Sequence, residues 1–159
     1  MVCPLSVQLV YWVASSITSF YIDELIIAME NKVHVWIGSN FSSEEEYMHY
    51  FEMDYTTEGD FTDPDYIRCG FCQDLDIDWY DDDFIGIIER KEHEVLLDEL
   101  LCDAAVEDYE KKRINVKCEQ LGIYRANAIV WYQDGSLTVS HDSQKLFNGL
   151  HYIGVFDGD

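Results

Sequence analysis

Three aspartates alternate with apolar residues midway along the chain, at Asp74, Asp76 and Asp78. Alternating carboxylates also begin the calcium-binding loop of an EF-hand. That loop needs glycine at its sixth position and a bidentate glutamate at its twelfth, where this chain has Trp79 and Ile85. The spacing therefore does not predict an EF-hand calcium site, and it leaves only weak, unspecific cation binding open to these aspartates.

Cys69 and Cys72 have the CxxC spacing of many zinc sites and thiol–disulfide oxidoreductases. Zinc would require two further ligands, for which Cys102 and Cys118 are the candidates. A redox role requires a stabilised thiolate, and the neighbouring aspartates oppose one. We therefore favour buried structural thiols for this pair.

Other catalytic signatures are missing from the sequence, which has no GxSxG, no glycine-rich phosphate loop and no HExxH. Carboxylate pairs carry no information, because 32 acidic residues place some pair at glycosidase spacing by chance. We expect a binding protein that is not an enzyme and has no cofactor and no metal. The alternative is a small metal-binding or thiol-redox protein that uses Cys69 and Cys72 or the cluster from Asp74 to Asp83.

The formal charge of −22 over 159 residues limits the kinds of partner. It argues against binding nucleic acid or an anionic membrane through a basic patch. It favours a cationic partner, since a strong field attracts opposite charge, although a merely solvated acidic surface is the plainer alternative. Five cysteines without a regular framework suit a reducing compartment, so we expect a cytoplasmic protein.

The acidic residues are concentrated between Glu52 and Asp83, a stretch that holds twelve of them and a single cation, Arg68. Aromatic residues run through the same stretch. Acidic and aromatic side chains together predict a binding face for something basic. The candidate partner-binding residues are Asp76, Asp78, Trp79, Tyr80, Asp81, Asp82 and Asp83.

Strands are predicted where β-branched and aromatic residues cluster, over 33–37, 84–89, 126–132 and 151–156. The dipeptide Asp134-Gly135 predicts a hairpin whose return strand covers residues 137–140. Within the first strand, His34 faces solvent or forms a hydrogen bond, since no second histidine lies at metal-ligand spacing.

Helices are predicted from caps and periodicity. Ser43 and Glu46 have capping-box spacing and begin a helix that extends to about Asp54, with Tyr47, Met48 and Phe51 as its apolar stripe. Asp63 and Pro64 begin a short helix over 65–73. Residues 94–101 are helical, and Asp103 caps a further helix to Leu121, which Gly122 ends. The inward residues of that last helix are Ala105, Val106, Tyr109 and Val116, and Lys111, Lys112, Arg113 and Lys117 form its basic patch.

These elements predict an α+β fold: a single domain with a mixed or antiparallel sheet of four to five strands and two to three helices packed on it. Residues 29–159 form this domain, and residues 1–28 are an apolar extension. The extension lacks the basic residues of a signal peptide, and Leu9–Ile22 is shorter than the roughly 20 apolar residues of a membrane span. A translation start at Met29 would leave the extension outside the native protein.

Several segments are similar to the bacterial immunity protein 22 family, whose members belong to polymorphic toxin systems. The segments are HVWIG from His34, SEEEYMHYFEMD from Ser43, WYDDDF from Trp79, ANA from Ala126 and YIGVF from Tyr152. The similarity extends from Lys32 to Asp159 and contains no catalytic signature.

The resemblance implies a cytoplasmic antidote that binds and blocks a cognate toxin domain without chemistry of its own. Many such toxins are nucleases, whose active-site cleft is basic. An acidic face with aromatic anchors could cover that cleft, with Trp79 and Tyr80 of the residue types that dominate binding energy. The implied partner is a toxin with a cationic face, not nucleic acid or membrane, and the oligomeric state is left open.

Overall fold

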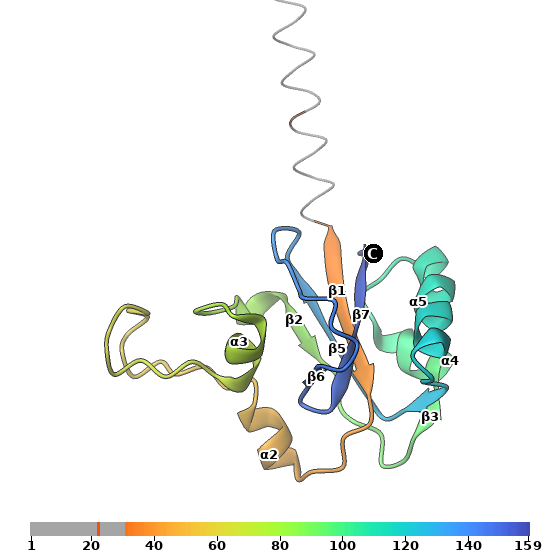
Figure 1. Ribbon diagram of the computed structural model, residues 1–159, viewed down its shortest axis with the longest axis horizontal. Coiled ribbons are helices and arrows are strands. Elements are labelled where there is room, and N and C mark those ends of the chain that lie inside the picture. Colours follow the sequence, from red (N-terminus) through yellow and green to blue (C-terminus); the bar gives the residue numbers. More distant parts are fainter. Residues whose placement is uncertain (1–21, 23–30) are drawn as a thin grey trace, which may run out of the picture.

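The fold is organised around one strand in the middle of an antiparallel sheet. The computed structural model describes residues 22 and 31–159, with elements labelled as in Figure 1. The five-stranded sheet has the order β2-β5-β1-β7-β6, and every neighbouring pair is antiparallel. Its strands are β1 (Lys32–Gly38), β2 (Ile85–Ile87), β5 (Ala128–Gln133), β6 (Leu146–Phe147) and β7 (Leu150–Asp157). Strands from both ends of the described chain therefore pair at its centre.

The central strand β1 carries buried side chains on both faces of the sheet. Successive side chains of a strand point to opposite faces, so Val33, Val35 and Ile37 pack into one core cluster and Trp36 into another. The predicted strand over residues 33–37 is confirmed. A strand buried on both sides requires a covering layer on each face, which makes this a three-layer α+β domain.

Helices and a small sheet cover the face of Val33, Val35 and Ile37 (Figure 1, right). They are β3 (Val95–Leu96), α4 (Leu97–Leu100), the 3-10 turn η2 (Leu101–Asp103), α5 (Asp108–Gln120) and β4 (Arg125–Ala126), with β3 and β4 paired. The predicted helix over 94–101 thus begins as a strand. The described residues contain four α-helices, where two to three were expected.

The long helix α5 starts later than predicted and turns a different side inward. It is preceded by Glu107 rather than Asp103, and Ala105 and Val106 lie before it. Tyr109 and Val116 are exposed, so the predicted inward face is wrong for them. Its buried positions are Glu110, Ile114 and Cys118, which are spaced four residues apart. Gly122 follows the helix in the left-handed region, as its predicted terminating role requires.

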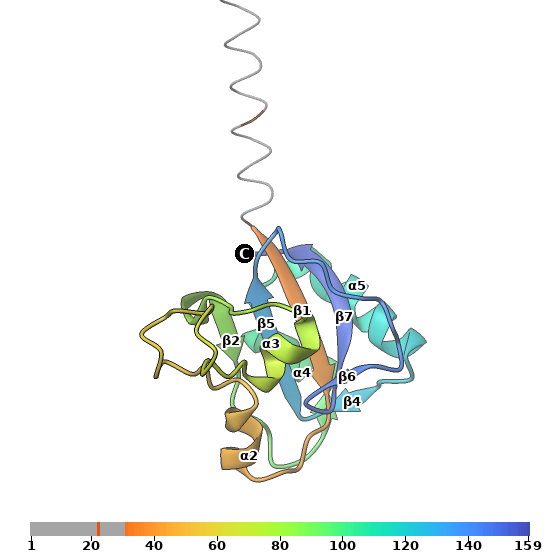
Figure 2. The ribbon, with the colours of Figure 1, turned by 60° about the vertical axis from the view of Figure 1, so that its left-hand side comes forward.

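Aromatic side chains fill the opposite face of the sheet. On this side α3 (Gly70–Leu75) lies over the sheet, and α2 (Glu44–His49) lies at one end of it (Figure 2). Phe71 packs edge-on against Trp36 and Tyr80, with ring centroids 5.3 and 5.2 Å apart. Phe51 and Tyr47 make a similar edge contact at 5.6 Å. Each such pair stabilises the core by roughly 0.5–1.5 kcal/mol beyond the area it buries.

The capping box that begins α2 is confirmed. The Ser43 side chain accepts a hydrogen bond from the Glu46 N–H, and the Glu46 carboxylate accepts one from the Ser43 N–H. The helix ends at His49 rather than near residue 54, and of its predicted stripe Tyr47 and Phe51 are buried whereas Met48 is exposed. Because a helix this short turns one narrow side to the core, Met48 falls outside it.

The second predicted helix lies in the wrong place. Residues 65–69 are not helical, and α3 begins at Gly70 with Cys69 as its N-cap. Asp63 does accept a backbone hydrogen bond two residues on, from Asp65, but that bond closes a turn. A Cβ on Gly70 would lie 2.4 Å from a ring carbon of Tyr50, so the start of α3 is packed too closely for any larger residue.

Two strand predictions need correction. Residues 126–132 belong to two strands, β4 and β5, because Asn127 leaves the ladder between them. Residues 137–140 form no strand, and β5 pairs with β1 and β2 instead. The Asp134 carboxylate accepts hydrogen bonds from Ser136, which closes a local turn without returning the chain along β5.

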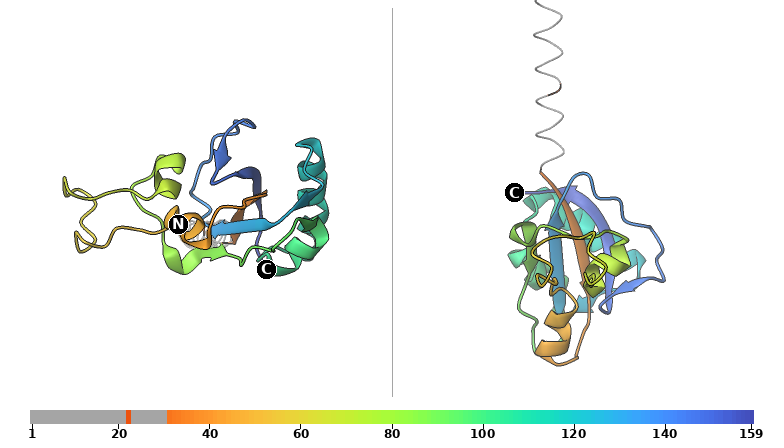
Figure 3. Two further views of the ribbon diagram at one scale, coloured as in Figure 1. Left: turned by 90° about the horizontal axis from the view of Figure 1, so that it is seen from below. Right: turned by 90° about the vertical axis from the view of Figure 1, so that its left-hand side faces the viewer.

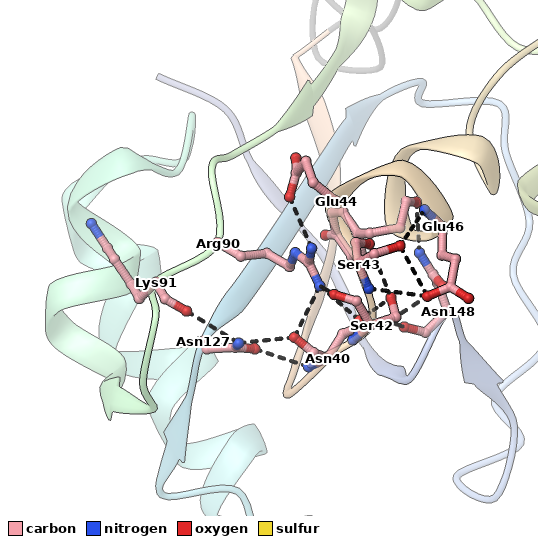
Figure 4. A network of polar contacts seen from close by, with 10 residues as sticks. Asn40, Ser42, Ser43, Glu44, Glu46, Arg90, Lys91, Asn127 and Asn148 are labelled. Atoms are coloured by element: carbon pink, nitrogen blue, oxygen red, sulfur yellow. Dashed lines mark hydrogen bonds and ion pairs between the residues drawn. The ribbon is translucent and has the colours of Figure 1, made fainter.

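A buried polar network joins the loop after β1 to the rest of the domain (Figure 4). The Asn127 amide, 2% exposed, accepts from the Asn40 N–H at 2.9 Å and donates to the Asn40 carbonyl at 2.9 Å. Arg90 donates to the carbonyls of Asn40 and Ser42 and to the Glu44 carboxylate. Its guanidinium also lies 4.2 Å from the Tyr47 ring centroid. The network fixes where α2 begins.

The interpretations of residues 1–28 lie outside the described residues, apart from Ile22. No helix within the described part is long and apolar enough to cross a bilayer.

Candidate partner-binding face

A long loop between α2 and α3 projects from one side of the domain (Figures 1 and 3). We define the acidic lobe as loop residues 52–69 together with the segment 76–83. Aromatic contacts hold the two parts together: the rings of Phe61 and Trp79 stack with centroids 5.4 Å apart. The Tyr66 hydroxyl donates to the Asp78 carbonyl at 2.6 Å. Phe61, Tyr66 and Trp79 therefore connect the loop to the segment 76–83.

Several carboxylates of the acidic lobe build its turns. Asp54 and Asp60 each accept from the backbone N–H two residues on, in Thr56 and Thr62, at 2.9 Å. The same threonine hydroxyls also donate to them, and these bonds lower the pKa of both carboxyl groups. Part of the unusual acidity of this stretch thus has a local structural reason, because short polar side chains stabilise turns by bonding the backbone.

Three of the predicted site aspartates also have local roles. Asp76 ends α3 in the left-handed region, and its carboxylate lies 3.6 Å from the Arg68 guanidinium. Asp81 caps the short 3-10 turn η1 (Asp82–Phe84). Asp82 accepts from the Tyr55 hydroxyl at 2.6 Å, which ties the loop to the segment 76–83.

The two predicted aromatic anchors differ in accessibility. Trp79 is 48% exposed, with one ring face covered by Phe61. Tyr80 is 3% exposed, and its hydroxyl donates to the Phe51 carbonyl at 2.5 Å. Tyr80 is therefore a core residue, and the expectation that it would present a surface anchor is corrected. Tyr80 turns inward, whereas its neighbour Trp79 remains at the surface.

Four carboxylates of the acidic lobe remain unengaged. The side chains of Glu58, Asp65, Asp78 and Asp83 are exposed and form no hydrogen bond or ion pair with any residue that the structure describes. Of the seven predicted site residues, Asp78, Asp83 and the open ring face of Trp79 are therefore the groups most available to a partner.

Two separate grooves include residues of the segment 76–83 in their linings. One, of about 680 Å³, is lined by Asp76 and Trp79 together with Lys145. The other, of about 1000 Å³, lies between α2 and the sheet edge at β2 and includes Tyr55, Tyr80 and Asp82. The structure thus divides the predicted site between two concave surfaces instead of forming one.

The four cysteines that the structure describes do not assemble into a metal site. Cys69 and Cys72 lie in the aromatic core cluster, whereas Cys118 lies in the cluster on the other face of the sheet. Cys102 is exposed. Within residues 22 and 31–159, no group of three or more potential metal-ligating side chains comes together. The zinc site that would combine these four cysteines is therefore contradicted.

The surroundings of Cys69 stabilise its thiolate form, whereas the sequence predicted that the neighbouring aspartates would oppose it. Hydrogen bonding from the Cys72 side chain, aided by the Cys72 N–H at 3.3 Å, lowers the pKa of Cys69 to about 7. The same interaction raises the pKa of Cys72. The neighbouring aspartates do not decide the outcome because the direct bonds are closer.

A buried histidine lies on the same face of the sheet. The His34 ring, 3% exposed, contacts the Tyr152 hydroxyl at 2.8 Å and the Asp134 carbonyl at 2.9 Å. Burial lowers the pKa of His34. Because a carbonyl only accepts, Nε2 carries the proton and Nδ1 accepts from Tyr152, so the neutral ring satisfies both contacts. The hydrogen-bonding alternative for His34 is confirmed.

Comparison with known proteins identifies the family. The model of the Immunity protein 22 family matches residues 33–159, so the chain belongs to that family. No curated protein and no solved structure matches it. The family assignment supports an immunity function in general.

The groove beside β2 includes residues that the sequence did not indicate as a site. They are Glu45, Met48, Glu52, Met53, Ile85 and Ile87. The glutamates at the start of α2 and the helical position of Met48 were visible in the sequence. Their position beside β2 depends on the tertiary structure, since 35 residues lie between the end of α2 and the start of β2.

Proposed function

We propose that this protein neutralises a cognate bacterial toxin by binding the toxin domain through the acidic lobe, without chemistry of its own. The observation that carries the proposal is the charge of the lobe, in which eleven carboxylates are opposed by Arg68 alone. The family assignment implies a toxin partner, and this surface is suited to a cationic one.

The exposed groups of the lobe suit such an interface. Tyr55 and Trp79 are 59% and 48% exposed, and Phe84, which directly follows the lobe, is 47% exposed. The unengaged carboxylates Asp78 and Asp83 lie next to Trp79 and Phe84 in the sequence. Carboxylates attract a basic surface from a distance, and partly exposed aromatic rings supply contact area at low conformational cost. The aromatic contacts within the lobe also reduce the ordering that binding would require.

A nuclease is the toxin class that this surface fits best. Its active-site cleft must be basic to hold phosphates, and the lobe presents carboxylates that could replace them. Electrostatic steering then accelerates association, toward about 10⁸–10⁹ M⁻¹s⁻¹ at low salt. Such a protein acts in the cytoplasm of the bacterium that it protects.

The test is the binding of the toxin domain encoded beside this gene, in a catalytically inactive form. Replacing Asp81, Asp82 and Asp83 with asparagine removes three charges while keeping the side-chain oxygens that cap η1 and accept from Tyr55. We expect slower association and a shallower dependence of the association rate on salt. An unchanged salt slope would place the interface elsewhere.

The matched control removes three charges from other surfaces. Glu92, Glu99 and Glu119 are exposed, and the last two belong to the α4–α5 layer on the other face of the sheet. Replacing them with glutamine changes the net charge equally. The control should alter association much less than the Asp81–Asp83 variant, because screening at physiological salt limits each charge to a range of about 8 Å.

One observation favours a second candidate, a thiol-redox role. Cys69 has a lowered pKa because the thiol of Cys72 donates a hydrogen bond to it. Redox-active CxxC pairs also contain one cysteine with a lowered pKa. Replacing both cysteines with serine separates the two candidates, because toxin binding should survive and any thiol–disulfide exchange should be lost.

A further inference from the structure

We infer that the groove between α2 and β2 receives an extended, basic segment of the toxin, which adds to the sheet as a sixth strand beside β2. The inference rests on the proposed function and specifies which surface of this protein the toxin contacts. Three features carry it: an open sheet edge, an apolar floor and a rim of carboxylates.

The first feature is the open edge of the sheet. Strand β2 is last in the order β2-β5-β1-β7-β6, so no described strand pairs with its outer side. The Ile88 N–H donates to the Ile129 carbonyl of the adjacent strand β5. Since hydrogen-bonding direction alternates along an antiparallel strand, Gly86 also faces β5, whereas Ile85 and Ile87 direct their N–H and C=O groups to the open edge.

The second feature is the floor of the groove, which runs along that edge. The groove has a volume of about 1000 Å³, and the side chains of Met48, Phe51, Met53, Ile85 and Ile87 contribute to its lining. Met48 is 40% exposed although it lies on a helix that packs on the core. A strand added beside β2 would place alternate side chains over this floor, as peptide recognition by strand addition requires.

The third feature is the charge of the rim. Glu45, Glu46, Glu52 and Asp82 line the groove, and His49 is the one residue there that can carry a positive charge, at 3.2 Å from the Glu52 carboxylate. An acidic rim over an apolar floor selects a segment in which basic and apolar residues occur together. It disfavours an acidic segment, because opposing like charges would lie close together.

The same charges argue against a second copy of this chain at the edge. Asp81, Asp82 and Asp83 precede β2 and Glu89 follows it. Charged residues that flank a short edge strand prevent pairing between identical copies. They leave the edge open to a strand of opposite charge, so the toxin is favoured as the occupant.

Backbone amide exchange gives the most direct test, because this strand contains its own control. When the inactive toxin domain binds the full chain, we expect exchange at Ile85 and Ile87 to slow by at least tenfold. Exchange at Gly86, whose N–H already faces β5, should change much less. Equal change at all three residues, or none at any, would overturn the inference.

A charge series at Met48 tests the groove through side chains. Met48 is exposed, so substitutions there leave the core intact, which thermal unfolding of each variant verifies. We expect Met48→Lys to weaken toxin binding at least tenfold and Met48→Glu to retain or strengthen it. Equal loss in both variants would show that the occupant is not basic.

The outcomes separate the inference from the proposed function. If the unmodified chain does not bind the toxin, both fail. A second outcome combines three results: the unmodified chain binds the toxin, the Asp81–Asp83 variant shows the shallower salt slope, and Met48→Lys binds normally. In that case the proposed function stands, but the groove is not the contact surface. Slow exchange at Ile85 and Ile87 in the free protein would show that a second copy or another part of this chain already occupies the edge, which also overturns the inference.

Discussion

Trp79 stacks on Phe61 with ring centroids 5.4 Å apart and ring planes inclined by only 4°. Eighteen positions separate the two residues in sequence, so the contact closes the projecting loop onto the segment 76–83. The acidic lobe therefore holds its shape through aromatic contacts even though its carboxylates repel one another.

We predict that this contact governs the order of the loop. Phe61→Ala and Trp79→Ala should each speed protease cleavage within residues 52–69. In a double-mutant cycle measured by urea unfolding, the pair should show a coupling free energy of about 0.5–1.5 kcal/mol. Additive effects would mean that the rings do not support each other in solution.

Phe61→Ala also separates two roles of Trp79 in toxin binding. If the tryptophan contacts the toxin through its open face, Trp79→Ala should weaken binding more than Phe61→Ala does. If the two variants weaken binding equally, the stack acts by ordering the loop, and Trp79 is not an anchor.

The thiol pair leads to a prediction about titration. Because bonds from Cys72 lower the pKa of Cys69 to about 7, thiolate absorbance should rise near neutral pH. Cys72→Ala removes the thiol donor, so the midpoint should move up toward the ordinary value near 9. Cys69→Ser provides the blank, and a neutral-pH rise that persists in this blank would come from another cysteine.

Acidification should destabilise the protein through His34. Burial lowers the pKa of this ring below 6.5, so the folded state binds fewer protons than the unfolded state as the pH falls past that value. The stability that the neutral ring contributes is complete above pH 6.5 and is lost below it. Urea unfolding between pH 7.5 and 5.5 should show a smaller loss in His34→Gln than in the unmodified protein. Parallel losses would contradict the assignment.

Arg90 should be sensitive even to a conservative change. Its side chain donates to two carbonyls and to the Glu44 carboxylate while lying over the Tyr47 ring, and it is 10% exposed. Lysine lacks the planar fork that reaches these acceptors together. Arg90→Lys should lower the free energy of unfolding by about 1.5–3 kcal/mol. Arg125→Lys, at an exposed position, is the control and should stay within about 0.5 kcal/mol of the unmodified protein.

Asn127 should be equally sensitive, for a different reason. Asn127→Ala would leave the Asn40 N–H without its acceptor in a part-buried site, and the Asn40 carbonyl would keep only its bond from Arg90. An unsatisfied buried group costs about 1–3 kcal/mol, which urea unfolding can measure. Asn31→Ala, at an exposed position just before β1, should change the free energy of unfolding little.

The sequence by itself determined the elements whose signals are local. The β-branched and aromatic residues of β1 predicted a buried strand, and only the structure showed that it is buried on both faces. The capping box of Ser43 and Glu46 located the start of α2, because both partners lie within one helical turn. The same locality made the strands β2 and β7, the terminating role of Gly122 and the α+β class predictable.

Only the tertiary structure decided which side chains reach the surface. Tyr80 and Trp79 are adjacent and similar in composition, yet one donates to Phe51 in the core and the other stacks on Phe61 at the surface. The predicted inward face of α5 was wrong because the start of this helix depends on where the chain leaves η2. The predicted hairpin was wrong because the turn at Asp134 closes locally on Ser136. The groove between α2 and β2 had no local signal at all, since it arises where Met48 and Ile85 are brought together by packing on β1 and β5.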